Sequence, residues 1–167
     1  SNFSEAQASA IVAFLRAKAA RAAASAGDAA NGRAIFMGKG NCASCHRVNG
    51  VGARIAPDLS EIGRIRHSTD IERALVEPDV MIVPSNRFVK LVTREGTTIT
   101  GRLLNQDIFT VQLLDSREQL RSIARADLRE FAFVDKSPMP SYRDKLSSQE
   151  LTDLVSYLVS LQSGGAQ

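Results

Sequence analysis

Two cysteines and a histidine lie within five residues of one another in the run "NCASCHRVNG", residues 41–50. They are Cys42, Cys45 and His46, and the chain of 167 residues contains no other cysteine. A run of this kind suits three chemistries: half of a structural zinc site, a dithiol redox pair, or the covalent attachment of a haem. A structural zinc ion needs four ligands, and His67 alone cannot replace the missing second pair.

Covalent haem attachment is the chemistry that would use all three residues. The two thiols add to the vinyl groups of the porphyrin, and the histidine that follows them binds the iron. A dithiol redox pair needs no histidine and lies at the start of a helix in a βαβ setting. The pattern also occurs by chance, so by itself it leaves the alternatives open. If the run carries a haem, the protein matures outside the cytoplasm, and we then expect a leader upstream of residue 1.

The composition is that of an ordinary globular chain. It is 44% hydrophobic, with a formal net charge of +3 and no tryptophan, and its length allows one domain or a domain with a small satellite. No apolar run approaches the length of a membrane span, and 4–18 is amphipathic, unlike a signal peptide. The net charge is too small to indicate a nucleic-acid partner.

Four segments have the caps and the apolar spacing that are typical of helices. They are 4–16, 28–38, 68–77 and 147–160. The first and last begin with capping boxes at Ser4 and Ser147, and they match at a constant offset of 143 residues. Either two capped helices simply look alike, or 1–27 closes a preceding, similar domain. The Ala-rich run 17–30 is expected to be a helical or semi-rigid linker.

The period of the apolar residues changes at Phe88. From there to residue 134 apolar and polar residues alternate. This segment is rich in β-branched residues and has turn signals at 95–96, 105–107 and 115–116. We expect four or five short antiparallel strands, with a vague likeness to a small Sm-like barrel, a type that can bind RNA. Acidic residues offset its arginines and aromatic stacking platforms are few, so we expect a packing or docking unit and no nucleic acid.

Together these residues resemble a class I c-type cytochrome over about 28–85 and 137–160. The motifs that carry the resemblance are, in chain order, "GRAIF" (32–36), "CASCH" (42–46), "APDLS" (56–60) and "MPSYRDKLSSQELTDLVSYLVSL" (139–161). In this family the glycine of the first motif lets two helices cross closely. The resemblance implies that Gly32, Phe36 and Tyr157 form that contact.

The resemblance also implies one covalent haem c. Cys42 and Cys45 would anchor the porphyrin, and His46 and Met139 would bind the iron from opposite sides. The carbonyl of Pro57 would accept a hydrogen bond from the histidine ring and fix its orientation.

Other residues are weaker candidates for the haem. Arg64 and Arg66 could bind the haem propionates through charge-assisted hydrogen bonds, the alternative for each being a solvated surface charge. Met37 and Met81 are expected in the core. His67 directly precedes a helix start and is expected at the surface.

The chain departs from the family's pattern in two ways. Residues 87–135 separate the proximal histidine from the distal methionine, and the tryptophan that often lies near a haem propionate is missing. The insertion fits a subfamily with an internal β-unit, often at the C-terminus of large dehydrogenase-like proteins. We therefore expect a mainly α fold: an N-terminal helix and linker (1–27), then a cytochrome c domain (28–167) with an inserted antiparallel β-unit (87–135) that leaves the iron chemistry unaffected.

The predicted function is one-electron transfer by a module that is not itself an enzyme. Methionine ligation favours ferrous iron, so the reduction potential is expected to be relatively positive. The expected partners are redox proteins or a fused dehydrogenase domain, and the expected location is the periplasm or another exported site, without a membrane span. The alternative is a haem enzyme or sensor whose distal ligand is displaced by peroxide or a gas.

Overall fold

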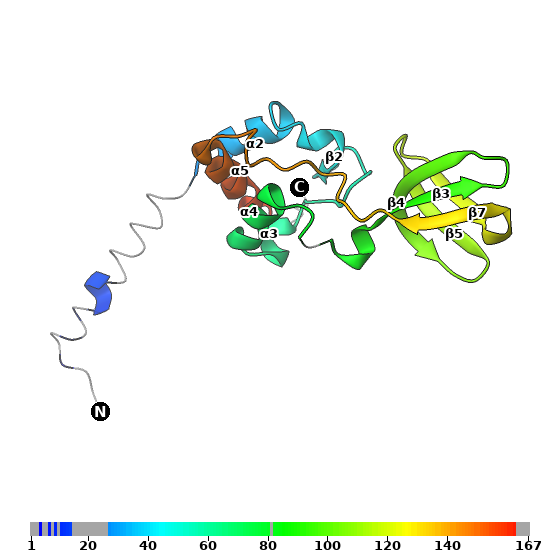
Figure 1. Cartoon of the computed structure of the whole chain (residues 1–167). Coiled ribbons are helices and arrows are strands. Elements are labelled where there is room, and N and C mark those ends of the chain that lie inside the picture. The colour runs from blue at the N-terminus through cyan, green and yellow to red at the C-terminus, as the bar shows by residue number, and fades with distance from the viewer. Residues whose placement is uncertain are drawn as a thin grey trace.

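The computed structural model describes residues 4, 7, 9, 11–14, 27–80 and 82–162. Its elements gather in two regions (Figure 1). The first region contains α2 (Ala29–Met37), β1 (Arg47–Val48), β2 (Val51–Gly52), α3 (Ile62–Ile65), α4 (Ser68–Val76) and α5 (Ser148–Ser160). The second contains β3 (Phe88–Thr93), β4 (Thr98–Gln106), β5 (Thr110–Asp115), β6 (Leu120–Ala124) and β7 (Leu128–Phe133). Short 3-10 turns occur at η1 (Cys42–Ser44), η2 (Pro84–Asn86) and η3 (Arg125–Asp127).

The expectation of a mainly α fold is wrong. Of the described residues, 35% are helical and 25% lie in strands, in a five-stranded and a two-stranded sheet, so the fold is α+β. The reason is the length of the inserted strands, since β4 alone has nine residues, as many as α2 or α4. No helix in the described part of the chain is long and apolar enough to cross a membrane.

Helices α2 and α5 cross at very short range. A Cβ atom on Gly32 would lie 2.0 Å from the carbonyl oxygen of Asp153, so only glycine fits at this point of α2. One turn further on, the rings of Phe36 and Tyr157 pack edge to face, with 5.6 Å between their centroids. This confirms the predicted contact between the glycine and the two aromatic residues.

A buried carboxylate joins the same two helices. Asp153 is 3% exposed and accepts hydrogen bonds from the backbone N–H of Asp28 at 2.8 Å and from the side chains of Asn31 and Gln149 at 2.6 and 2.9 Å. These bonds, with that from Asn31 the strongest, lower the pKa of Asp153. The sequence patterns gave no sign of this contact, because its partners are more than 120 residues apart.

The predicted helix starts are confirmed where the structure describes them. Asp28 caps α2 by accepting from two backbone N–H groups, and Ser147 forms the predicted capping box with Glu150 at the start of α5. At the N-terminus, Ser4 and Gln7 exchange the hydrogen bonds of a capping box. Residues 7, 9 and 11–14 are helical, and residues 1–3, 5–6, 8, 10 and 15–26 lie outside the described residues.

The five-stranded sheet confirms the prediction of four or five antiparallel strands. Its order is β6-β5-β4-β3-β7, a four-stranded meander followed by η3 and a strand that returns beside the first. The turn predicted at 105–107 lies two residues later, at 107–109, because β4 continues through Gln106. Asp107 begins the turn by accepting from the N–H groups of Phe109 and Thr110.

The sheet has its own core and brings its two ends together. Val89, Leu91, Val111 and Leu113 are fully buried in a cluster separate from the helical core. At the sheet's base, the N–H of Val134 donates to the carbonyl of Phe88 at 2.9 Å. The insertion therefore leaves and rejoins the helical region at neighbouring points, as Figure 1 shows.

Candidate haem-binding site

The run 41–46 folds into a tight turn after α2. The N–H groups of Cys45 and His46 both donate to the carbonyl of Cys42, at 3.1 and 2.9 Å. The Cys42 side chain belongs to the helical core, whereas Cys45 is exposed, and both thiols are free. Burial raises the pKa of the Cys42 thiol. The turn thus presents one thiol from the edge of the core and one from the surface.

The His46 ring is held by the loop that follows β2. Its Nδ1 lies 2.8 Å from the carbonyl oxygen of Pro57, which can only accept, so Nδ1 donates and the Nε2 lone pair is left free. Burial lowers the pKa of His46, which favours the neutral imidazole that a metal ligand requires. The backbone N–H groups of Ala56 and Leu59 donate to the carbonyls of Cys45 and Arg47, each at 2.8 Å, and so bind the loop to the run that carries the histidine.

A small hairpin that the sequence analysis did not predict packs against the cysteine turn 41–46. Strands β1 and β2 are joined by Asn49 and Gly50, both with positive φ, as in a type I′ turn. Gly52 has a φ of 102°, and a Cβ there would lie 2.2 Å from the carbonyl oxygen of His46. The hairpin backbone therefore lies directly against the histidine's own backbone.

Met139 lies in the irregular segment between β7 and α5. Its side chain is partly buried against the helical core, to which Cys42 also belongs. The segment is fixed to the end of α4, because the N–H of Ser137 donates to Asp79 at 2.7 Å and the N–H of Tyr142 donates to the carbonyl of Leu75 at 2.9 Å. These contacts fix the segment on both sides of Met139.

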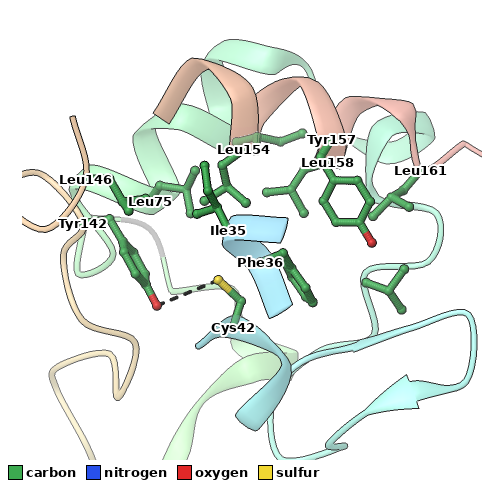
Figure 2. Close-up of a cluster of buried hydrophobic side chains, with 12 residues drawn as sticks. Ile35, Phe36, Cys42, Leu75, Tyr142, Leu146, Leu154, Tyr157, Leu158 and Leu161 are labelled. Carbon is green, nitrogen blue, oxygen red and sulfur yellow. Dashed lines mark hydrogen bonds between the residues drawn. The ribbon is translucent and has the colours of Figure 1, made fainter. Parts of the chain in front are cut away.

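Tyr142 joins this segment to the cysteine turn. Its hydroxyl donates to the carbonyl of Gly40 at 2.6 Å and lies 3.9 Å from the sulfur of Cys42. Figure 2 shows the ring beside Leu146 and its hydroxyl directed at the cysteine. Burial raises the pKa of Tyr142. In the sequence this tyrosine is only part of the run "MPSY", and its role follows from burial, because a buried tyrosine hydroxyl needs a partner.

A comparison with protein families bears on the chemistry of the cysteine turn. Residues 29–108 match the family model for cytochrome c. The match supports a class I c-type cytochrome domain with a covalently bound haem c and haem-based electron transfer. A search of curated proteins finds no match to the chain. The matched range includes Cys42, Cys45, His46 and Pro57, and it ends before Met139.

Arg47, directly after His46, is a further residue of interest that the sequence analysis missed. Its Nη2 donates to the carbonyl of Gly50 at 2.8 Å, but its Nε is buried without a hydrogen-bond partner within the described part of the chain. A buried donor without a partner is costly, so an acceptor is expected beside it. A haem propionate is such an acceptor, and this donor, two free thiols and a histidine with a free Nε2 fit a covalent haem.

The two arginines predicted for the propionates lie elsewhere on the domain. Arg64 of α3 is exposed and pairs with Glu61, the N-cap residue of that helix. Arg66 is partly buried and lines a small surface pocket with Asp70 and Arg73. Neither has a hydrogen bond to the cysteine turn among the contacts of the described residues, and their role at the haem stays a prediction.

The alternative iron ligands have separate outcomes. Met37 is 47% exposed at the end of α2, so its expected place in the core is wrong. It continues the exposed side of the helix that carries Arg33 and Ala34, whereas Ile35 and Phe36 face the core. His67 is exposed at the N-cap of α4, as expected, and its side chain makes no capping bond. Met81 lies outside the described residues. Within the described ranges, no three His, Cys, Asp or Glu side chains are grouped as a metal site would require.

Proposed function

We propose that this chain carries single electrons through one haem c, with His46 and Met139 as axial ligands, and that it is not itself an enzyme. The observation that carries the proposal is the 2.8 Å contact between His46 Nδ1 and the carbonyl of Pro57. It fixes the tautomer and the orientation of the ring and raises the basicity of Nε2. The contact lies within the range that matches the cytochrome c family.

The chain's own residues would act in distinct ways. When bound, the haem supplies a one-electron couple at its iron. Cys42 and Cys45 would hold the porphyrin edge through thioether bonds, and His46 would give the Nε2 lone pair to the metal. The unpaired Nε of Arg47 would donate to a propionate, in addition to or in place of Arg64 and Arg66.

Met139 would supply the second axial ligand from the opposite side. Its partly buried position against the helical core and the hydrogen bonds that fix its segment to α4 support this role. A thioether is a weak donor that favours ferrous iron, so the potential should be relatively positive. With both axial positions filled by side chains, small substrates would have no easy access to the metal, which favours a carrier over a catalyst.

The setting that suits such a module is outside the cytoplasm. Covalent haem attachment takes place there, so we propose a periplasmic or otherwise exported protein. Its partners would be redox proteins or a dehydrogenase domain of the same polypeptide, as in the subfamily with an inserted β-unit. The antiparallel sheet between α4 and Met139 supports that subfamily.

Two measurements on the matured protein test the proposal. Intact-mass analysis after denaturation should give the chain plus one haem, and acidified acetone should fail to extract it. The ferric spectrum should be low-spin, with a thioether-to-iron charge-transfer band at its red edge. A high-spin ferric spectrum would instead support the alternative, an enzyme or sensor with a displaceable distal ligand, and extractable haem would contradict covalent attachment.

A further inference from the structure

The five-stranded sheet contacts the haem-binding region through two side chains. Arg102 of β4 donates from Nε to the carbonyl of Ile55 at 3.0 Å and from Nη2 to the carbonyl of Arg54 at 3.2 Å. Glu118, in the turn between β5 and β6, accepts from the backbone N–H and the Nε of Arg54, at 3.3 and 3.1 Å. Four hydrogen bonds from the sheet therefore converge on two consecutive residues.

Those two residues belong to the loop that ends at Pro57. On its other side the loop is bonded to the cysteine turn, since Ala53 donates to the carbonyl of Ala43 at 2.9 Å and Ala56 to that of Cys45 at 2.8 Å. The loop thus lies between the sheet and the turn that carries His46. Any movement of the loop would displace the Pro57 carbonyl that holds the histidine ring.

Both side chains are held in place by the folded sheet. Arg102 is partly buried in the central strand, where desolvation lowers the pKa of its guanidinium. Glu118 has a φ of 59°, in the left-handed region where glycine or asparagine is easier to place. Glu118 ends the three-residue loop between β5 and β6, a place where hairpins commonly have a left-handed residue, so the turn fixes the position of its backbone.

We propose that Arg102 and Glu118 are positioning residues for the proximal ligand, and that the inserted sheet supports the His46 ring through the loop 54–57. The proposal rests on the proposed function, in which His46 binds the iron. It replaces the expectation that the insertion leaves the iron chemistry unaffected. A looser loop would weaken the bond from Nδ1 to the Pro57 carbonyl and make Nε2 a poorer donor, so the reduction potential would rise.

Three variants of the haem-loaded protein test this positioning. Arg102→Ala removes both bonds to the loop, Arg102→Lys leaves a single point donor, and Glu118→Gly removes the carboxylate while relieving the left-handed backbone. The matched control is Arg125→Ala, since Arg125 donates to Asp107 and Gln106 within the sheet. The readouts are the reduction potential and hydrogen exchange at the Ala56 amide.

We expect Arg102→Ala and Glu118→Gly to raise the potential and to speed exchange of the Ala56 amide by about tenfold. Arg102→Lys should have a smaller effect and Arg125→Ala none. If Arg102→Ala does not fold, Glu118→Gly decides, because glycine suits that backbone. If Arg102→Ala and Glu118→Gly leave the reduction potential unchanged, the proposal is overturned, even if the Ala56 amide exchanges faster. It is also overturned if Arg125→Ala shifts the potential as much as they do. If the spectrum of the wild-type protein itself shows no histidine bound to the iron, the proposed function is contradicted instead.

Discussion

The side-chain amide of Asn31 in α2 donates to the carboxylate of Asp153 in α5, with 2.6 Å between Nδ2 and Oδ2. The same carboxylate accepts from the backbone N–H of Asp28, the residue that caps α2. One buried anion thus ties the start of the first helix of the domain to the last one. This joins the two ends of the domain at the place where the helices cross.

Stability should depend on the charge of this carboxylate. Because folding lowers the pKa of Asp153, its contribution is present above the ordinary value of about 3.9 and is lost as pH falls through the lower folded value. Asp153→Asn should therefore be less stable than the wild type at pH 7, and the difference should shrink in acid. Urea unfolding at several pH values measures this, with exposed Asp144→Asn as the control. If the difference in the free energy of unfolding between Asp153→Asn and the wild type does not depend on pH, the effect comes from packing and hydrogen-bond geometry and not from the charge.

The helix crossing should tolerate no side chain at Gly32. Gly32→Ala places a Cβ against the α5 backbone, which must move, and we expect a loss of about 3 kcal/mol in the free energy of unfolding. Ala34→Ser on the exposed side of the same helix should change it by less than about 0.5 kcal/mol. Chemical denaturation compares the two. A Gly32→Ala variant at least as stable as the wild type would mean that the higher helix propensity of alanine outweighs the cost of the crossing.

The Tyr142 hydroxyl should contribute to stability independently of any haem. Tyr142→Phe leaves the Gly40 carbonyl without its 2.6 Å partner in a buried place, at an expected cost of about 1 to 3 kcal/mol. Chemical denaturation of matched samples measures it. A variant as stable as the wild type would show that another donor reaches this carbonyl.

Met139 decides between a carrier and a catalyst. Met139→Ala should leave the haem attached through Cys42 and Cys45, open the distal side to water or an added ligand, and lower the reduction potential. Met37→Ala and His67→Ala, both at exposed positions, should neither open the distal side nor lower the reduction potential. Potentiometric titration and ferric and ferrous spectra of the three variants check this. A wild-type spectrum in Met139→Ala would refute the ligand assignment.

Local signals in the sequence predicted the local parts of the fold. The caps at Asp28 and Ser147 were confirmed because a cap and its partners lie within three residues of each other. The alternating segment likewise predicted the strands. The mainly α class was wrong because the inserted strands are long, with nine residues in β4 alone. Met37 was misplaced because it lies on the exposed side of α2, while the neighbouring Phe36 is buried.

The contacts that position the candidate site are between residues far apart in the chain. Tyr142 lies 102 residues from Gly40, and Arg102 lies 47 from Ile55. The sequence around Tyr142 does not set it apart from the chain's other tyrosine, nor does that around Arg102 from the other arginines, so no spacing rule selects them. The strained backbone at Glu118 is also visible only in the folded chain.

The paired ends of the inserted sheet have a consequence for the entropy of the chain. Ser137 and Asp79 must meet across 58 residues to fix the Met139 segment on α4. Once Val134 is bonded to Phe88, the flexible path between them shortens to about 12 residues. Each doubling of a flexible loop costs about 0.6 kcal/mol, so the folded sheet lowers the closure cost by about 1.4 kcal/mol. The insertion thus separates the proximal and distal sides of the site in sequence while acting on the folding chain as a short connection.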